Sequence, residues 1–383
     1  MSHDSCPLCA SGNISLFLGR PGVPVHQNLL LNSPEQARSI SCSDLEMMVC
    51  AECGFVFNRA FDHSLLQYGQ DYDNNQGCSS SFQHHLDDLV ALLIDNKGVR
   101  SKQVVEVGCG QGQFLQRLVL EGGNSGVGFD PSYSGPEEVL GGRMCFESRY
   151  YDESCTSVPA DVVICRHVIE HVPDPVVLLK SVRAAIGDRT SAKVYFETPC
   201  VEWILRNGVV WDFFYEHCSL FTAESLSSAF QLAGFRVDEV RHIFGGQYLW
   251  IEASPIVSDA VFDGDRIFDL ATACAGHEQE LLQGWKQRIM DIAVDGRVAL
   301  WGAGAKGVTF ANLIDPQCQF IDCLVDLNPN KQGKYVAGSG HTIVDPLQLK
   351  ERGVTDVLLM NPNYRNENQK ILEQAGISLN LIE

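Results

Sequence analysis

The sequence predicts an α/β protein with two layered α/β units, preceded by a loop-rich segment that carries cysteines. In the central region and again near the C-terminus, short apolar runs typical of strands alternate with stretches typical of helices. Such alternation predicts parallel sheets whose strands are joined by crossover helices. The strand-like runs are QVVEVG (103–108), GVGFD (126–130), DVVIC (161–165), KVYFE (193–197) and YLWIEAS (248–254), followed by RVALWG (297–302), FIDCLVD (320–326) and VTDVLLM (354–360).

The length of the chain supports more than one domain. At 383 residues it exceeds an ordinary single domain. We expect a cysteine-bearing module at 1–85, a central α/β domain at 86–253 and a second α/β domain at 254–383. A polar, helix-like segment near 275–292 leads into the strands of the last part. Two such units in one chain predict a cleft between them, where ligands commonly bind.

The charge balance restricts the partners of the protein. Its 28 basic and 48 acidic residues give a formal charge of −20. Nucleic-acid binding requires a basic footprint, so we expect no nucleic-acid partner. An anionic small substrate is still compatible with locally gathered basic residues. We find no apolar run of membrane-spanning length and no basic-then-apolar signal at the N-terminus, which predicts a cytoplasmic protein without a membrane partner.

Two C-x-x-C pairs stand out near the N-terminus. Cys6 and Cys9 form one pair, and Cys50 and Cys53 form the other. In a reducing compartment, cysteines are thiols or metal ligands rather than disulfides. Two such pairs joined by a loop predict one tetrahedral zinc site, which would be structural because four thiolates fill the coordination shell. Cys42 lies nearby without a partner, and four free thiols are the alternative.

The first glycine-rich loop follows the strand-like run at 103–108. Gly108, Gly110 and Gly112 lie between this strand and a helix, where glycines allow the backbone to approach a ligand at the positive helix end. Glu106 ends the strand, and Asp130 ends the next one, where a carboxylate can accept both hydroxyls of a ribose. No Lys-Ser/Thr pair follows the last glycine, which excludes a phosphate-binding P-loop.

EVGCGQGQFL, followed by GFDPS and then DVVICRHVIEHVPDP, resembles a class I S-adenosylmethionine (SAM) methyltransferase with its Rossmann-like core. The resemblance covers about 150 residues. It implies that the glycine loop surrounds the methionine part of SAM, that the acid after the second strand binds the ribose, and that the end of the fourth strand lies near the sulfonium. By position, the implied SAM-binding residues are Glu106, Gly108, Gly110, Gly112, Asp130, Cys165 and Arg166, with His167 at the same strand end.

The order of the three parts resembles the nucleotide-sugar C-methyltransferases over nearly the whole chain. The paired cysteines, the NPNKQGKYVAGSGHTIVDP stretch and YEHCSLFTAESL carry this resemblance. It implies a zinc module, a SAM domain and a C-terminal α/β domain that contributes to binding the acceptor, a keto-deoxysugar on a nucleoside diphosphate. The family segment usually has a tyrosine two residues before its glutamate, and here Phe214 occupies that position.

The stretch WDFFYEHCSLFTAESL (211–226) places a phenol, an acid and an imidazole side by side. Methyl transfer to carbon requires a base to form a carbanion and a donor to stabilise the enolate oxygen. In this interpretation His217 is the base, Glu216 orients it or binds the sugar, and Tyr215 donates to the enolate oxygen. A satisfied histidine in a packed loop is the alternative. Thr222 predicts a plain helix N-cap, without a reciprocal capping box.

Other polar residues are weaker candidates for the active site. His167 ends the fourth strand and is a second candidate for the catalytic base. Glu170 and His171 are expected to be structural residues on the following turn. The DYDNNQ stretch at 71–76 either covers the cofactor or forms a solvated loop.

The second glycine-rich loop, WGAGAKG, contains Gly302, Gly304 and Gly307 between a strand and a helix, and Asp326 ends the following strand. Read alone, this pattern predicts nicotinamide dinucleotide binding. The resemblance implies instead that the helix end holds the pyrophosphate of the sugar nucleotide. A third interpretation is a domain that only packs and dimerises.

Three lysines would supply positive charge for those phosphates. Lys306 lies within the second loop, and Lys331 and Lys334 belong to NKQGKY. Together with Gly302, Gly304 and Gly307, they are the predicted substrate-binding residues.

The favoured function is SAM-dependent C-methylation of a nucleotide-linked keto sugar through an enolate. One alternative is an O- or N-methyltransferase of an activated sugar or related metabolite, which needs a base but no ketone. A non-catalytic zinc- and nucleotide-binding scaffold is an alternative from another class. The last alternative is a dehydrogenase that binds its cofactor at the second glycine loop, and NAD binding would distinguish it.

Overall fold

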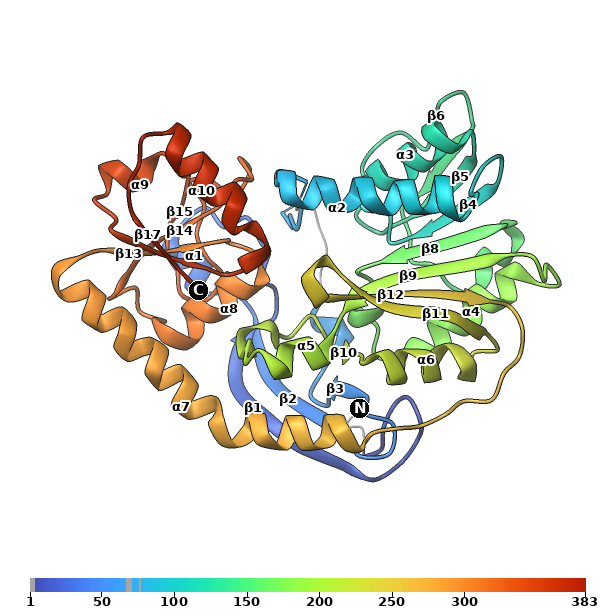
Figure 1. Cartoon of the computed structure of the whole chain (residues 1–383), viewed down its shortest axis with the longest axis horizontal. Coiled ribbons are helices and arrows are strands. Elements are labelled where there is room, and N and C mark those ends of the chain that lie inside the picture. The colour runs from blue at the N-terminus through green and yellow to red at the C-terminus, as the bar shows by residue number, and fades with distance from the viewer. Residues whose placement is uncertain (1–3, 67–70, 76) are drawn as a thin grey trace.

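The computed structural model describes residues 4–66, 71–75 and 77–383, which form three β-sheets with helices packed around them (Figure 1). The sheets have four, eight and five strands. All the strand-like runs expected from the sequence are strands of the second and third sheets. The prediction of an α/β protein with two layered units is therefore confirmed.

The first sheet is antiparallel, with the strand order β1-β2-β3-β10. Its elements are β1 (Ile14–Pro24), α1 (Pro34–Arg38), β2 (Cys42–Cys50), β3 (Val56–Asn58) and β10 (Ser219–Leu220). The last strand comes from within the segment 86–253, so the N-terminal module is completed by the central region. This pairing holds the 211–217 stretch against the N-terminal part of the chain.

The second sheet has the order β11-β12-β9-β8-β4-β5-β7-β6. The strands from β9 to β7 are parallel to their neighbours, whereas β12, β11 and β6 pair antiparallel. Its strands are β4 (Gln103–Val107), β5 (Ser125–Phe129), β6 (Glu138–Val139), β7 (Met144–Glu147), β8 (Val162–Arg166), β9 (Lys193–Pro199), β11 (Arg236–Ile243) and β12 (Tyr248–Ser254). Its helices are α2 (Ser80–Ala91), α3 (Gln113–Gly122), α4 (Pro175–Ile186), α5 (Val201–Arg206) and α6 (Ala223–Leu232).

The third sheet is parallel throughout, with the order β15-β14-β13-β16-β17. Its strands are β13 (Val298–Trp301), β14 (Ile321–Val325), β15 (Ile343–Val344), β16 (Asp356–Leu359) and β17 (Asn380–Ile382), and its helices are α8 (Ala305–Ile314), α9 (Gln348–Glu351) and α10 (Arg365–Gln374). Because the carboxyl ends of parallel strands meet at one edge, the parallel part of the second sheet and the whole third sheet each offer a ligand-binding edge.

Helix α7 (Asp265–Asp295) joins the second and third units and runs along the N-terminal sheet (Figure 1). Ile267 and Ala271, near its start, pack into the core that contains β1 and β2, while Ile289 belongs to the core of the C-terminal unit. Midway along, Glu278 accepts from the buried Arg20 at 2.6 Å. Arg20 also donates to the carbonyl of Phe213 at 2.9 Å, so these contacts fix the backbone before His217.

Helix α6 begins with a reciprocal capping box, which corrects the plain N-cap expected from the sequence. The backbone N–H of Ser225 donates to Thr222 Oγ1 at 3.0 Å, and the N–H of Thr222 donates to Ser225 Oγ at 2.9 Å. The Ser225 hydroxyl thus accepts the N-cap N–H, which is the role of a glutamate or glutamine side chain in the usual motif. Both residues are fully buried.

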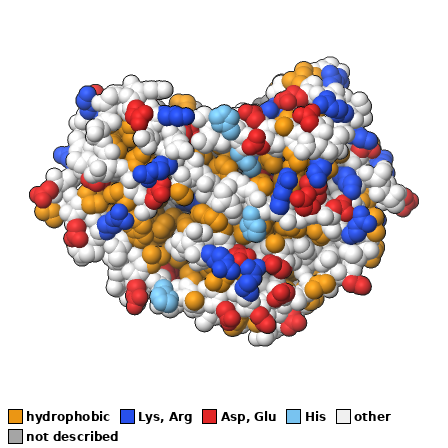
Figure 2. Space-filling view, in the orientation of Figure 1, with side chains coloured by type: hydrophobic (Ala, Val, Ile, Leu, Met, Phe, Trp, Pro, Cys, Tyr) orange, Lys and Arg blue, Asp and Glu red, His pale blue; other side chains and the backbone are white. Residues whose placement is uncertain are grey.

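The surface carries mixed charges and a hollow. In Figure 2 acidic and basic side chains are interspersed, and the outline is notched between its two upper lobes. In the described part of the chain, no helix combines the length and apolar character needed to cross a membrane.

Candidate active site

A cavity of about 250 Å³ lies where the three parts of the chain meet. The N-terminal part contributes Asn28, Tyr72, Asn74, Asn75, Cys78 and Ser79. The central unit contributes the turn after β8, the 212–217 stretch and the start of β12. The C-terminal unit contributes the second glycine loop and the ends of β14 and β16. The expected cleft is therefore present, and ligating groups from two parallel sheets face one space.

His217 lines this cavity and is held in place mainly by ring packing. Its imidazole lies 4.0 Å from the Phe214 ring and 4.9 Å from the His171 ring, measured between centroids. Its Nδ1 is buried and has no hydrogen-bond partner. Burial lowers the pKa of His217 well below its usual value, and the neighbouring His171 lowers it further. The ring is therefore neutral at pH 7 and can accept a proton.

Glu170 and His171 lie in the short turn after β8, as the sequence predicted, but they also line the cavity. Their ligand atoms and that of His217 all lie within 4.8 Å of one another. His171 Nδ1 lies 2.9 Å from the carbonyl oxygen of Glu216, which can only accept. The imidazole must therefore donate through Nδ1 there.

Glu216 and Tyr215 point away from the cavity, which corrects the roles expected for them. The Glu216 carboxylate is buried and accepts from the N–H of Gln27 at 2.9 Å, with His26 Nδ1 at 3.3 Å. The Tyr215 hydroxyl accepts from the N–H of Asp62 at 2.8 Å and is itself fully buried. The chain turns at Tyr215 and Glu216, and of the three residues only His217 lines the cavity.

His167 also lines the cavity, but it is a poor candidate for a base. Its Nδ1 lies 3.3 Å from Glu170 Oε1, and its Nε2 lies 3.6 Å from Glu197 Oε1. Burial opposes its positive charge, but the two carboxylates prevail and raise the pKa of His167 to about 9. It is therefore an imidazolium at pH 7, which cannot accept another proton. Its backbone also adopts a strained φ of 54°.

Glu197 on β9 is the acid that organises this wall. Arg166 Nε donates to Glu197 Oε2 at 2.6 Å, and His85 Nε2 lies 2.6 Å from Oε1. Burial alone would raise the pKa of Glu197, yet Arg166 and His167 hold it well below the usual range. Arg166 is thus committed to Glu197 and to the Phe114 ring, which lies 4.5 Å away. The Cys165 thiol is fully buried within the core.

The first glycine loop has the geometry of a SAM cradle. Gly110 has a φ of 54°, and a Cβ there would meet nothing within 4 Å, so a ligand has room beside it. Asp130 Oδ2 accepts from the N–H of Gly110 at 2.8 Å, which holds the acid against the loop. Glu106 is buried at the strand end with its Oε2 unpartnered, and burial raises its pKa to about 8. The unpartnered Glu106 oxygen and the space beside Gly110 fit a polar cofactor.

The second glycine loop repeats this arrangement. Asp326 Oδ2 accepts from the N–H of Ala303 at 2.9 Å, just as Asp130 accepts from its own loop. A Cβ on Gly307 would lie 1.9 Å from the carbonyl oxygen of Gly302, so only glycine lets α8 approach β13 this closely. Gly304 is the N-cap of α8, and all three glycines line the cavity.

Two of the three predicted lysines reach the cavity. Lys306 Nζ forms an ion pair with Asp212 at 2.9 Å, which links the second loop to the 212–217 stretch. Lys331 is buried, and its Nζ donates to Asn28 Oδ1 at 2.9 Å. Lys334 instead donates to Asn32 outside the cavity lining, which corrects its predicted role. In the 71–76 stretch, Tyr72 and Asn75 line the cavity, whereas Gln76 lies outside the described residues.

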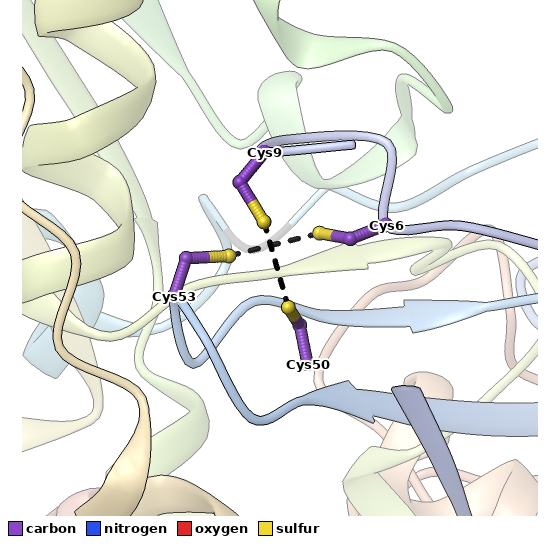
Figure 3. A group of neighbouring side chains, drawn as sticks. All are labelled: Cys6, Cys9, Cys50 and Cys53. Carbon is purple, nitrogen blue, oxygen red and sulfur yellow. Dashed lines mark hydrogen bonds between the residues drawn. The ribbon is translucent and has the colours of Figure 1, made fainter. Parts of the chain in front are cut away.

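The four paired cysteines converge on one point from two loops (Figure 3). Their sulfurs lie within 4.8 Å of one another, with 3.6 Å between Cys6 and Cys53 and 3.5 Å between Cys9 and Cys50. A tetrahedral zinc with Zn–S bonds of about 2.3 Å separates its sulfurs by about 3.8 Å. The donor set and its spacing therefore fit a zinc ion, while Cys42 is exposed and apart.

Comparisons with known proteins agree with this architecture. Residues 80–240 match a methyltransferase domain, and residues 277–377 match a C-methyltransferase C-terminal domain. The chain is 25% identical to the C-methyltransferase NovU of Streptomyces niveus over 97% of this chain and 94% of that protein. It is 26% identical to the ubiquinone biosynthesis O-methyltransferase of Sodalis glossinidius (strain morsitans), over 33% of this chain and 52% of that enzyme.

Solved structures resemble part of the chain. The N,N-8-amino-8-demethyl-D-riboflavin dimethyltransferase RosA of Streptomyces davawensis matches with a TM-score of 0.36 and 22% identity, over 45% of this chain and 54% of that one. The magnesium protoporphyrin IX methyltransferase ChlM of Synechocystis PCC 6803 matches with a TM-score of 0.34 and 15% identity, over 45% of this chain and 83% of that one.

The central sheet, its glycine cradle and the matching domain define the class of the protein: it is a SAM-dependent methyltransferase with a class I, Rossmann-like core. The C-terminal domain match and the similarity to NovU further support SAM-dependent methylation of carbon.

The sequence did not predict a site role for Tyr248 and Asp212, which line the cavity, or for Glu197, which pairs with the Arg166 and His167 side chains beside it. Glu197 gave a signal, because an acid within the apolar run KVYFE is buried if that run is an internal strand. Tyr248 and Asp212 gave none, since their side chains face the cavity only through the packing of β12 and the 212–217 stretch.

We predict that replacing Asp130 weakens SAM binding, whereas replacing its counterpart Asp326 does not. A charge-assisted hydrogen bond contributes roughly 1.5–3 kcal/mol, so Asp130→Ala should raise the Kd of SAM about tenfold or more. Asp326→Ala is a matched control, because it removes the same kind of loop contact from the other unit. Calorimetric titration with SAM measures both, and unchanged affinity in Asp130→Ala would mean that the cofactor binds elsewhere.

Proposed function

We propose that the protein is a SAM-dependent C-methyltransferase that acts on a nucleotide-linked keto-deoxysugar through an enolate. The single observation that carries the proposal is the position of a neutral His217 in a cavity that also receives the second glycine loop. The lining of this cavity includes a base, and it also includes a helix N-terminus and two lysines. A ligand with an acidic C–H at one end and phosphates at the other satisfies both.

The reaction begins with proton removal. The carbon beside a ketone is acidic because the carbonyl delocalises the charge that deprotonation leaves. His217 takes that proton, and the electron pair moves from the C–H bond into the enolate. The enolate carbon then attacks the methyl group, and SAM, when bound, supplies this methyl group as an electrophile. Because burial keeps imidazole neutral, His217 is in the accepting form throughout the neutral pH range.

The second loop is proposed to hold the pyrophosphate of the acceptor. The N-terminus of α8 offers unpaired backbone N–H groups and the positive end of a helix dipole. Lys306 and Lys331 both line the cavity there, although the chain as a whole is acidic. In the structure Lys306 pairs with Asp212, and Lys331 donates to Asn28. The oxygens of a bound phosphate can take the place of Asp212 and Asn28 as acceptors.

The paired cysteines are proposed to bind one structural zinc. The four thiolates would complete the coordination shell, so this ion would have no open position for a substrate. The site lies at the end of β2, whose partner β1 carries the Arg20 that fixes the stretch before His217. Zinc binding would therefore stabilise the sheet that positions the proposed base.

We predict about one zinc per chain in protein purified without chelators. Cys53→Ser should remove the metal and lower the melting temperature, because a thiolate corner of the shell is lost. Cys42→Ser changes an exposed cysteine outside the cluster and should leave the zinc content unchanged. Elemental analysis of the three proteins measures the metal, and a native stoichiometry near zero would refute the site.

We predict that Lys306→Ala raises the KM of a sugar-nucleotide acceptor and leaves the SAM affinity unchanged. The loss of one charge-assisted contact should raise KM about tenfold or more. Lys286→Ala, on the exposed face of α7, provides a control for the loss of a lysine elsewhere. Thermal stabilisation by NAD, without stabilisation by a sugar nucleotide, would instead favour a dehydrogenase.

We predict that His217→Asn abolishes both proton exchange and turnover while both ligands still bind. With S-adenosylhomocysteine in place of SAM, the native enzyme should exchange the acidic proton of a keto sugar for deuterium from heavy water. Removal of a general base costs about 10²–10⁴ in rate. NMR or mass spectrometry follows the exchange, and His277→Asn on the exposed face of α7 is the matched control.

Two results would contradict this assignment. If the His217→Asn enzyme exchanged at the native rate, the base would be another residue. If the native enzyme showed no exchange and methylated a hydroxyl or an amine, the carbanion mechanism would be wrong and O- or N-methylation would replace it.

A further inference from the structure

We propose that Tyr248 donates the hydrogen bond that stabilises the enolate oxygen of the acceptor. This inference rests on the proposed function, because only a carbanion beside a carbonyl places negative charge on such an oxygen. Transition-state charge of this kind needs a donor that is already in place, and it is among the largest contributions in comparable reactions. The stretch before His217 does not supply that donor.

The sequence offered Tyr215 as the phenol, but its hydroxyl is committed elsewhere. It accepts from the N–H of Asp62 at 2.8 Å and donates to the carbonyl oxygen of Ala60 at 3.5 Å, and Tyr215 is not among the residues that line the cavity. At the neighbouring position, Phe214 does line the cavity, but it presents a ring without a hydroxyl. The donor must therefore come from another element of the cavity wall.

Tyr248 is the first residue of β12 and lines the same cavity as His217. Its ring is fixed on two sides, stacked on Phe244 at 5.1 Å and contacting the edge of His167 at 4.6 Å. Among the described hydrogen bonds, none involves its hydroxyl. That hydroxyl is also absent from the fully buried, unpartnered polar atoms, so it has contact with the open space of the cavity. A rigid ring with an uncommitted hydroxyl is a preorganised donor.

The electrostatic surroundings keep this hydroxyl protonated. Burial raises the pKa of Tyr248 well above its usual value, and the acidic groups around the cavity, including Glu197 and Asp212, raise it further. A phenol that stays protonated can donate throughout the pH range in which His217 is neutral. The two residues thus have complementary roles, with one accepting a proton from carbon and the other donating to oxygen.

Several other donors of the cavity wall are engaged or enclosed. His167 Nδ1 lies 3.3 Å from Glu170 Oε1, and its Nε2 is fully buried. Lys306 is paired with Asp212 at 2.9 Å, and Lys331 donates to Asn28 at 2.9 Å. Tyr364 lies in the C-terminal unit, on the side of the second loop.

The chemical step is balanced without any further reactant. As His217 removes the proton, the C–H electron pair forms the C–C double bond of the enolate, and the carbonyl oxygen gains negative charge. The Tyr248 O–H bond is not broken, because the hydroxyl only donates a hydrogen bond. The carbonyl re-forms when the enolate carbon takes the methyl group and the C–S bond breaks, which leaves S-adenosylhomocysteine and a proton on His217.

The test is Tyr248→Phe, which keeps the ring contacts with Phe244 and His167 and removes only the hydroxyl. The matched control is Tyr195→Phe, a buried tyrosine on the adjacent strand β9 that stacks on Trp250 outside the cavity lining. Both variants and Tyr364→Phe would be assayed for deuterium exchange, kcat, KM and SAM affinity.

Loss of one oxyanion donor typically costs about 10²–10³ in kcat. We expect Tyr248→Phe to lose this much in both exchange and kcat, with little change in KM or SAM affinity. Tyr195→Phe should stay within a few-fold of the native rates. A fall in melting temperature and in all parameters together would indicate a structural role and overturn the proposal.

The possible failures are distinguishable. Native exchange with an unaffected Tyr248→Phe would overturn the role of Tyr248 and leave the proposed function intact. A loss in Tyr364→Phe without one in Tyr248→Phe would transfer the role to the C-terminal unit and overturn the proposal as well. Absence of exchange in the native enzyme would overturn the proposed function, and the role of Tyr248 with it.

Discussion

The buried carboxylate of Glu197 is the charge around which the cavity wall of the central sheet is arranged. A buried charge is tolerated only when it is paired and hydrogen-bonded, and here Arg166 and His85 each contact one of its oxygens at 2.6 Å. The pairing commits Arg166 to the wall and keeps His167 protonated. His217 differs from His167, because burial and the neighbouring His171 lower its pKa and keep it neutral.

The two α/β units use one device for two purposes. In each, the acid after the second strand accepts a backbone N–H of the glycine loop, Gly110 for Asp130 and Ala303 for Asp326. The first loop leaves open space beside Gly110, whereas the second faces the shared cavity and carries a lysine. Similar local patterns therefore lead to different proposed ligands, because the environment of each loop differs.

The sequence predicted the elements of the site well because its signals were local. Glycine spacing, the acid after a strand and the C-x-x-C pairs depend on residues only a few positions apart, and the structure places each of these groups together. The Tyr215-Glu216-His217 stretch was a harder case. Sequence proximity suggested that the three side chains act jointly, but the chain turns at Tyr215 and Glu216, and these two side chains contact the backbone of Asp62 and Gln27 instead.

By itself, then, the sequence determined the α/β class, the order of the units, both glycine loops and the cysteine pairs. Those features follow from periodicity and spacing within single segments. Only the tertiary structure decided that Tyr248 lines the same cavity as His217, that Asp212 pairs with Lys306, and that β10 joins the N-terminal sheet. These contacts join segments distant along the chain. Their partners depend on how whole sheets and helices pack, and no local pattern records that packing.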